Sequence, residues 1–247
     1  MIIFIKLLLA HLIGDFILQP NSWVADKELK KEKSTYLYKH VVIHGALAWL
    51  FVSETRFWPY AILLIVFHFA IDILKLRLQT TATRRIWFIA DQILHVGSIA
   101  LIALLFNDVD FSQYEIDNKF VIIVTGIILL TTPTSIIIKN IISIWTPNEN
   151  DTNEADLQHA GKYIGILERL FVFCFIITGH FEAIGFLLAA KSIFRFGDLT
   201  HSRDRKLTEY VLIGTLISFG VAVFTGLLVE WALSFEPIQN PLIDIPN

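Results

Sequence analysis

Long apolar stretches recur along this chain, and they decide what it can fold into. Each approaches the length of a bilayer crossing, for which about twenty helical residues suffice, and polar or charged residues bound it. A water-soluble domain of this size has no room to bury them all, because hydrophobic residues make up 55% of the 247 and charged residues 17%. The sequence therefore predicts an all-α, polytopic transmembrane helix bundle.

About eight membrane-spanning helices fit the chain, which we treat as a single integral membrane domain over residues 1–247. The expected spans are residues 1–19, 39–54, 57–76, 86–106, 120–145, 162–179, 182–196 and 208–231. Pro133 lies inside the fifth span and predicts a kink there, because proline removes a helical hydrogen bond.

Lysine and arginine gather in some connections between the spans and avoid others. The basic connections are residues 20–38, 75–85 and 195–206. Residues 107–119 and the tail after Trp231 are poor in both. Because positively charged loops tend to stay in the cytoplasm, the basic connections are expected inside and both termini outside. The acidic connection 146–160 is the weak point of this topology.

The first four expected helices each carry a pair of His or Asp residues, and these pairs constrain where a functional site can lie. Every pair is spaced i, i+4, which places both side chains on one helical face about a turn apart. The pairs are His11 with Asp15, His40 with His44, His68 with Asp72, and Asp91 with His95. The topology was derived only from the positions of lysine and arginine. It nevertheless places all eight of these residues in the cytoplasmic half of the bilayer. The four helices are therefore expected to direct these side chains at one intramembrane site.

A polar contact between helices is the simplest explanation for one such pair. Four pairs are harder to explain in this way, because an ionisable group in the membrane costs about 2.5–3.5 kcal/mol. Neutral imidazole and carboxylate are ligands of divalent transition metals. We expect all eight residues to hold one or two ions, zinc first and iron or manganese otherwise. Residues 1–106 are then the metal-site helices, and residues 120–231 are supporting helices.

Charged residues in the second half of the chain have a structural interpretation. Glu168 and Arg169 are expected to form an intramembrane ion pair that holds helices together, with an anionic head group as the alternative ligand of Arg169. A basic cluster near the seventh helix is interpreted as the ordinary cytoplasmic excess rather than a seat for a lipid phosphate. The cluster consists of Lys191, Arg195, Arg203, Arg205 and Lys206.

Several motifs resemble those of a known family. They are His11-Leu-Ile-Gly-Asp15-Phe-Ile-Leu-Gln19, His40-x-x-x-His44-Gly45, Ala190-Lys191-Ser192-Ile193-x-Arg195-Phe196 and Glu209-Tyr210-Val-Leu-Ile-Gly214-Thr215. Over most of its length the chain resembles the bacterial integral-membrane family catalogued as domain of unknown function 3307. This resemblance implies a multi-pass protein of the bacterial inner membrane. A looser similarity, limited to the intramembrane pairs, is to membrane-bound metal-dependent hydrolases.

Three functions compete at this point. The favoured one is a metal-dependent membrane hydrolase that cleaves a lipid or lipid-linked substrate from the cytoplasmic leaflet. A divalent-metal transporter is less favoured, because the helices beyond the pairs run apolar outward and offer no continuing polar path. A non-catalytic metal or haem protein is the third. Membrane lipids are the expected partners and no nucleic acid is expected, whereas the general base and the oligomeric state stay open.

Overall fold

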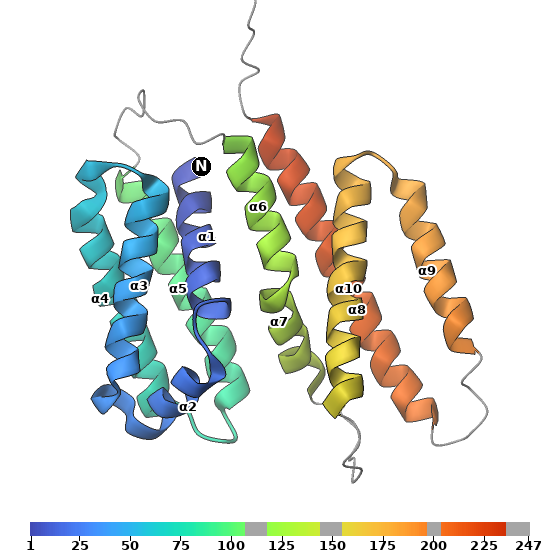
Figure 1. The fold of residues 1–247 in the computed structure, drawn as a ribbon, viewed down its shortest axis with the longest axis horizontal. Helices are drawn as coiled ribbons and strands as arrows, with labels where there is room; N and C mark the ends of the chain where they lie inside the picture. Colours follow the sequence, from blue (N-terminus) through green and yellow to red (C-terminus); the bar gives the residue numbers. More distant parts are fainter. Residues whose placement is uncertain (107–117, 144–154, 197–203, 236–247) are drawn as a thin grey trace, which may run out of the picture. The chain divides into compact units, whose positions relative to one another are not determined.

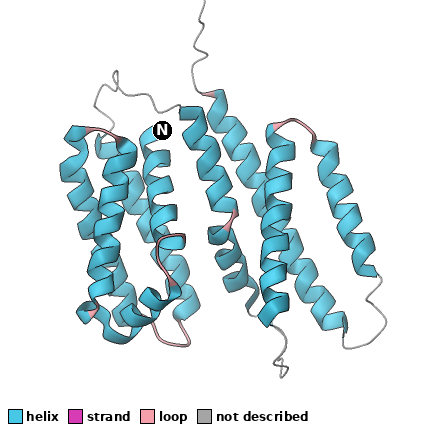
Figure 2. Cartoon of the chain, in the orientation of Figure 1, coloured by secondary structure: helices cyan, strands magenta, loops and turns pink. Residues whose placement is uncertain are grey.

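The computed structural model describes residues 1–106, 118–143, 155–196 and 204–235. Side chains are described in the same ranges except at residues 155–160, 194–196 and 204–209. The described residues form helices and turns without any strand, as Figure 2 shows. They divide into two compact units, Met1–Ile116 (unit 1) and Asp117–Asn247 (unit 2), which are described separately.

Four long helices enclose the interior of unit 1. They are α1 (Ile2–Phe16), α3 (Thr35–Val52), α4 (Trp58–Leu78) and α5 (Arg84–Phe106). The packing runs from α1 to α3, α4 and α5 and returns from α5 to α1 (Figure 1). Each helix therefore has one face directed into the bundle, as the i, i+4 pairs require.

A short helical segment crosses one end of this bundle (Figure 1). It consists of α2 (Asn21–Lys30) and the 3-10 helix η1 (Lys31–Lys33), which we call the α2 segment. The segment is bent by 81° from α1, because Pro20 lacks the N–H needed to continue the first helix. The sequence predicted only a connection over residues 20–38. Helix-forming residues such as Ala25 and Leu29 explain why most of that connection is helical instead.

The other end of unit 1, which holds Met1, is filled by an apolar core. Its members are Ile3, Leu7, Ala10, Ala48, Val52, Phe57, Ala61, Leu64, Ile99, Ile102, Ala103 and Phe106. The small residues among them allow the helices to approach closely. Phe57, in the 3-10 helix η2 (Thr55–Phe57), and Phe106 are fully buried and in ring contact at 5.0 Å between centroids. Lys6 is the only buried charged side chain that the structure describes at this end.

Unit 2 is built around its last helix. Its elements are α6 (Asn118–Leu130), α7 (Thr132–Ile142), α8 (Ala155–Ile177), α9 (Phe181–Phe196) and α10 (Asp204–Ser234). The helix α10 packs against α6, α7 and α8, and α9 packs against α8. The helix expected over residues 120–145 is interrupted at Thr131, and Pro133 lies in the first turn of α7. The predicted kink is therefore confirmed as a break between two helices.

The buried Arg169 side chain stabilises this break. Its Nε donates a hydrogen bond to the Leu130 carbonyl oxygen at 2.7 Å, and its Nη2 donates to the Thr131 carbonyl at 3.2 Å. The same guanidinium also donates to the hydroxyls of Ser135 at 2.6 Å and Ser218 at 3.1 Å. Carbonyls at the end of a helix lack intrahelical partners and carry a partial negative charge. The guanidinium therefore satisfies the carbonyls that the break exposes.

Glu168 and Arg169 do not pair with one another. Glu168 instead accepts a bond of 2.5 Å from Lys191, which joins α8 to α9. An ion pair does hold helices together here, as predicted, but Arg169 is not part of it. The other members of the basic cluster predicted beside Lys191 lie outside the described side chains.

Three helical segments are long and apolar enough to cross a membrane. They are Arg84–Phe106, Asn118–Ile142 and Tyr210–Ser234. The bent pair of α1 and the α2 segment is a further candidate. On α5, Ile86 is 68% and Leu104 73% exposed, which suits a helix that faces lipid. Helices thus occur at each of the expected spans, and among the described residues these three have the length and composition of a membrane crossing.

Candidate metal centre

The eight residues singled out by their spacing all point into unit 1. They come from α1, α3, α4 and α5, at the end of the bundle that the α2 segment crosses. Seven of them are buried, and the Asp15 side chain is 12% exposed. The structure therefore brings the four pairs together, as the i, i+4 spacing predicts for inward helical faces.

Asp15 lies at the centre of this cluster. Its Oδ1 is 3.0 Å from Nε2 of His44, 3.2 Å from Nε2 of His40 and 3.6 Å from Nε2 of His68. The two nitrogens of His40 and His68 are 3.0 Å apart. A tetrahedral ion with bonds of 2.0–2.1 Å would separate neighbouring ligand atoms by about 3.3 Å. These separations therefore match those of one coordination shell, and all four ligand atoms lie within 4.8 Å of one another.

Several polar atoms of the cluster have no hydrogen-bond partner. Although His44 Nε2 and Asp15 Oδ1 are 3.0 Å apart, neither makes a hydrogen bond of acceptable geometry. Buried polar atoms without partners are rare in proteins, because each costs about 1–3 kcal/mol. Atoms that converge on one point without bonding to each other are instead typical of a ligand set.

Two lysines neutralise the other two carboxylates. Lys27 Nζ, from the α2 segment, is 2.9 Å from Asp72 Oδ2, and Lys75 Nζ is 2.9 Å from Asp91 Oδ2. Sequence reasoning used both lysines only to orient the connections and missed their place in the site. Lys75 follows Asp72 by three residues and so lies on the same helical face, a spacing that could have predicted its place beside the cluster. Lys27 offered none, because its position depends on the bend after α1.

Asp15 therefore differs from the other two carboxylates of the cluster. Its Oδ2 accepts a bond of 3.3 Å from Gln92, which also donates to Asp91 at 3.1 Å, and the described residues give it no lysine partner. With neutral imidazoles, the three carboxylates and two ammonium groups leave one negative charge, at Asp15. A single divalent cation fits this charge better than two.

His11 and His95 form the second part of the cluster. His95 Nδ1 donates to the Asp91 carbonyl oxygen at 2.9 Å and lies 3.7 Å from the Asp91 carboxylate. In a neutral imidazole that donates through Nδ1, the Nε2 atom is an acceptor, and His95 Nε2 has no hydrogen-bond partner. Neither nitrogen of His11 has one. Both rings thus keep nitrogen atoms free within the cluster.

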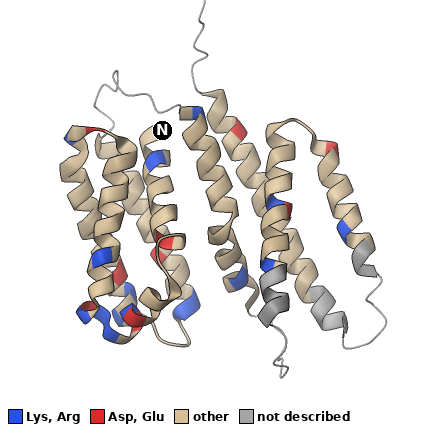
Figure 3. Cartoon of the chain, in the orientation of Figure 1, with Lys and Arg blue, Asp and Glu red and all other residues tan. Residues whose placement is uncertain are grey.

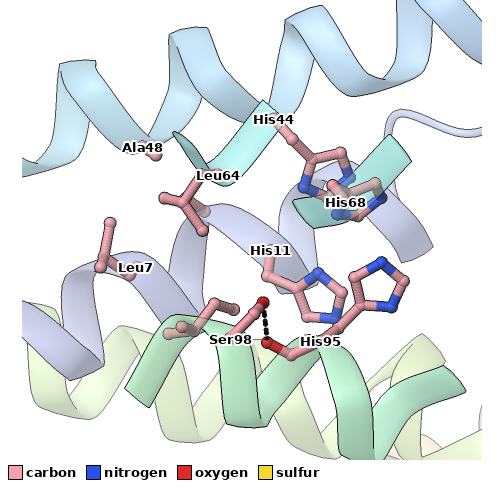
Figure 4. A pocket seen from close by; sticks show the side chains of 10 residues that line it. Leu7, His11, His44, Ala48, Leu64, His68, His95 and Ser98 are labelled. Carbon is pink, nitrogen blue, oxygen red and sulfur yellow. Dashed lines mark hydrogen bonds between the residues drawn. The ribbon is translucent and has the colours of Figure 1, made fainter. Parts of the chain in front are cut away.

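A cavity of about 20 Å³ lies beside these rings. Imidazoles of His11, His44, His68 and His95 gather on one side of it (Figure 4). The opposite side is mainly apolar, with residues of the apolar core such as Leu7, and Ser98 also lines the cavity. The volume suits one water-sized group with polar partners on a single side.

Ion pairs attach the α2 segment to the ends of α4 and α5. Glu28 binds Arg84 at 2.8 Å and accepts a bond of 3.2 Å from Gln79, and Glu32 binds Arg77 at 3.2 Å. In Figure 3 most of the charged residues of unit 1 lie toward this end. Individually such exposed pairs contribute little, but together with the buried Lys27 they hold the segment over the cluster.

Fold and site together define a helical protein with helices long and apolar enough to cross a membrane and a buried cluster of His and Asp able to hold a metal ion. Residues 3–124 match the family described as protein of unknown function (DUF3307), and this part of the chain is similar to that family. The match contains all eight residues of the cluster, and the motifs after residue 190 that were expected to share the resemblance lie outside it. No curated protein and no solved structure matches the chain.

Proposed function

We propose that this protein is a metal-dependent hydrolase of the bacterial inner membrane that cleaves a lipid or lipid-linked ester, amide or phosphate from the cytoplasmic leaflet. One divalent ion, zinc first and iron or manganese otherwise, would be held by three of the residues Asp15, His40, His44 and His68, and water would complete its coordination. The observation that carries the proposal is His95, whose unpartnered Nε2 lies in the same cluster and beside the same cavity. Ligands and a free base together are what metal-assisted hydrolysis requires.

The proposed reaction divides the work between the ion and His95. A bound ion lowers the pKa of its water and polarises the scissile group. His95 Nε2 would accept a proton from the attacking water, whose oxygen would form the new bond to the acyl carbon or phosphorus atom. As the bond to the leaving group breaks, His95 would return the proton to that group. The main-chain carbonyl of Asp91 orients the His95 ring through Nδ1, and the Asp91 carboxylate, paired with Lys75, lies 3.7 Å from the same nitrogen.

Two features disfavour the alternative functions. The apolar core occupies the interior of unit 1 between the cluster and the Met1 end, so the ligands do not continue into a polar path across the bundle. A transporter needs such a path to both faces of the membrane. A haem-binding protein is disfavoured because the cavity of about 20 Å³ is far smaller than a haem. The His44 and His68 rings also stack on each other at 3.9 Å between centroids, so they do not stand on opposite sides of a macrocycle.

The surroundings of the cluster support a lipid substrate. Large apolar side chains are exposed on the helices around it, including Val42 and Leu50 on α3 and Ile93 on α5. Exposed apolar faces of this kind suit contact with acyl chains. On the α2 segment Leu29 is 83% exposed beside several lysines, a combination that suits an interface with charged head groups.

Labelling of single cysteines tests the proposed orientation, with both termini outside. Leu29→Cys, on the exposed face of the α2 segment, should react with a membrane-impermeant thiol reagent only after the cytoplasmic side is opened. Trp58→Cys, at the opposite end of unit 1, should react in intact spheroplasts. Both substitutions are made in a Cys174→Ser background, since Cys174 is the free cysteine of the chain. The reverse pattern would contradict the inner-leaflet assignment.

Metal analysis combined with a lipid hydrolysis assay tests the proposed function. Protein purified in detergent without chelator is expected to contain about one zinc ion per chain and to release water-soluble products from inner-membrane lipids. Chelation should stop product release, and added zinc should restore it. A metal-free protein with an unchanged thermal unfolding temperature after zinc addition would contradict the proposal, because ligands that bind the folded state raise that temperature.

A further inference from the structure

A second set of ligands lies within the same cluster. One nitrogen each of His68 and His95 and one carboxylate oxygen of Asp72 lie within 4.8 Å of one another, and all three residues are buried. The ammonium of Lys27 is 2.9 Å from Asp72 Oδ2, the side of the carboxylate that faces the α2 segment. The Lys27 ammonium therefore already neutralises the Asp72 carboxylate, which is the acidic ligand of this set.

We propose that His68, Asp72 and His95 form a second divalent-metal site, and that the Lys27 ammonium closes it by occupying the Asp72 carboxylate. The inference rests on the proposed function, because it takes an ion at Asp15 as given. When both sites are filled, His68 turns to the second ion and Asp15, His40 and His44 retain the first. Three protein ligands with an open position are usual for a catalytic zinc ion.

Electrostatics explains why the native protein closes the second site. A second divalent ion would lie beside the first and beside the buried ammonium, and it would compete with Lys27 for the Asp72 carboxylate. Displacing Lys27 would leave a buried charge without its partner, a change that costs several kcal/mol in proteins. The lysine is itself buried, so solvent does not compensate for the loss.

The closure has a direct consequence for His95. A second ion would take the Nε2 atom that the proposed reaction uses as its base. Lys27 therefore keeps His95 free by satisfying Asp72 in place of a metal. Since Lys27 reaches the cluster only through the bend at Pro20, the α2 segment sets the number of ions that the site accepts.

Zinc content after removal of the ammonium tests the inference. Lys27→Met removes the charge and keeps an unbranched side chain, so the variant is expected to bind about two zinc ions per chain where the wild type binds about one. Zinc is measured by mass spectrometry on protein dialysed against a zinc buffer. A Lys27→Met protein that still binds only one ion overturns the inference. If this variant does not purify in folded form, Lys27→Gln takes its place with the same two outcomes.

Matched variants separate the second site from a general effect of charge. Lys75→Met removes the other ammonium but should keep about one ion, because Asp91 belongs to no group of three ligands in the described residues. Asp72→Asn in the Lys27→Met background should return the content to one. A second ion in Lys75→Met, or its persistence without Asp72, also overturns the inference. Absence of zinc from wild type and Lys27→Met alike would instead contradict the proposed function.

Discussion

Asp15→Asn is expected to lower the zinc affinity of the protein more than about 100-fold, the upper range for residues that only support a ligand. Asp15 is the carboxylate without a lysine partner, and its Oδ1 lies within 3.6 Å of three imidazole nitrogens. Asparagine keeps the size of the side chain but removes the charge that balances the ion. Isothermal titration of the metal-free protein with zinc measures the change.

Asp26→Asn is the matched control for this prediction. Asp26 also lies in unit 1, but it belongs to the α2 segment, pairs with Lys30 and is not part of the cluster. The same chemical change there should leave zinc affinity unaltered. Full zinc affinity in Asp15→Asn would show that the cluster is a set of polar contacts between helices.

Much of the candidate site followed from helical geometry alone. The period of 3.6 residues fixes which side chains share a face, so pairs such as His40 with His44 converge wherever four such faces enclose one interior. The break near Pro133 was equally predictable, because the missing N–H is a local property. The convergence of the pairs and the break near Pro133 both depend on residues within one or two turns of helix, so the sequence alone could predict them.

The division of roles within the site depended on contacts that the sequence does not encode locally. Asp15, Asp72 and Asp91 are equivalent as sequence patterns, and only the positions of Lys27 and Lys75 distinguish them. Lys27 lies 45 residues from Asp72 in the chain and meets it through the bend of the α2 segment. The positive-inside rule assigned that lysine to a loop, since charge alone says nothing about burial.

His95→Gln is expected to lower lipid turnover by about 10²–10⁴, the usual contribution of a general base, while the protein keeps its zinc. Glutamine can still donate to the Asp91 carbonyl, but its amide does not accept a proton from water. Turnover and zinc content are measured on one preparation. His180→Gln is the matched control, because His180 is exposed in unit 2. Loss of zinc in His95→Gln would make His95 a ligand and not the base.

The same variant separates catalysis from transport. A hydrolase keeps its ion through turnover, so proteoliposomes of wild type and of His95→Gln should show no zinc flux, and only the wild type should release lipid products. A transporter would instead move zinc at a rate that saturates with its concentration, without any lipid product. Beyond the cluster, the described interior of unit 1 consists mainly of the apolar core, which disfavours such a flux. Saturable zinc uptake by the wild type would therefore contradict both the hydrolase and the one-sided site on which it depends.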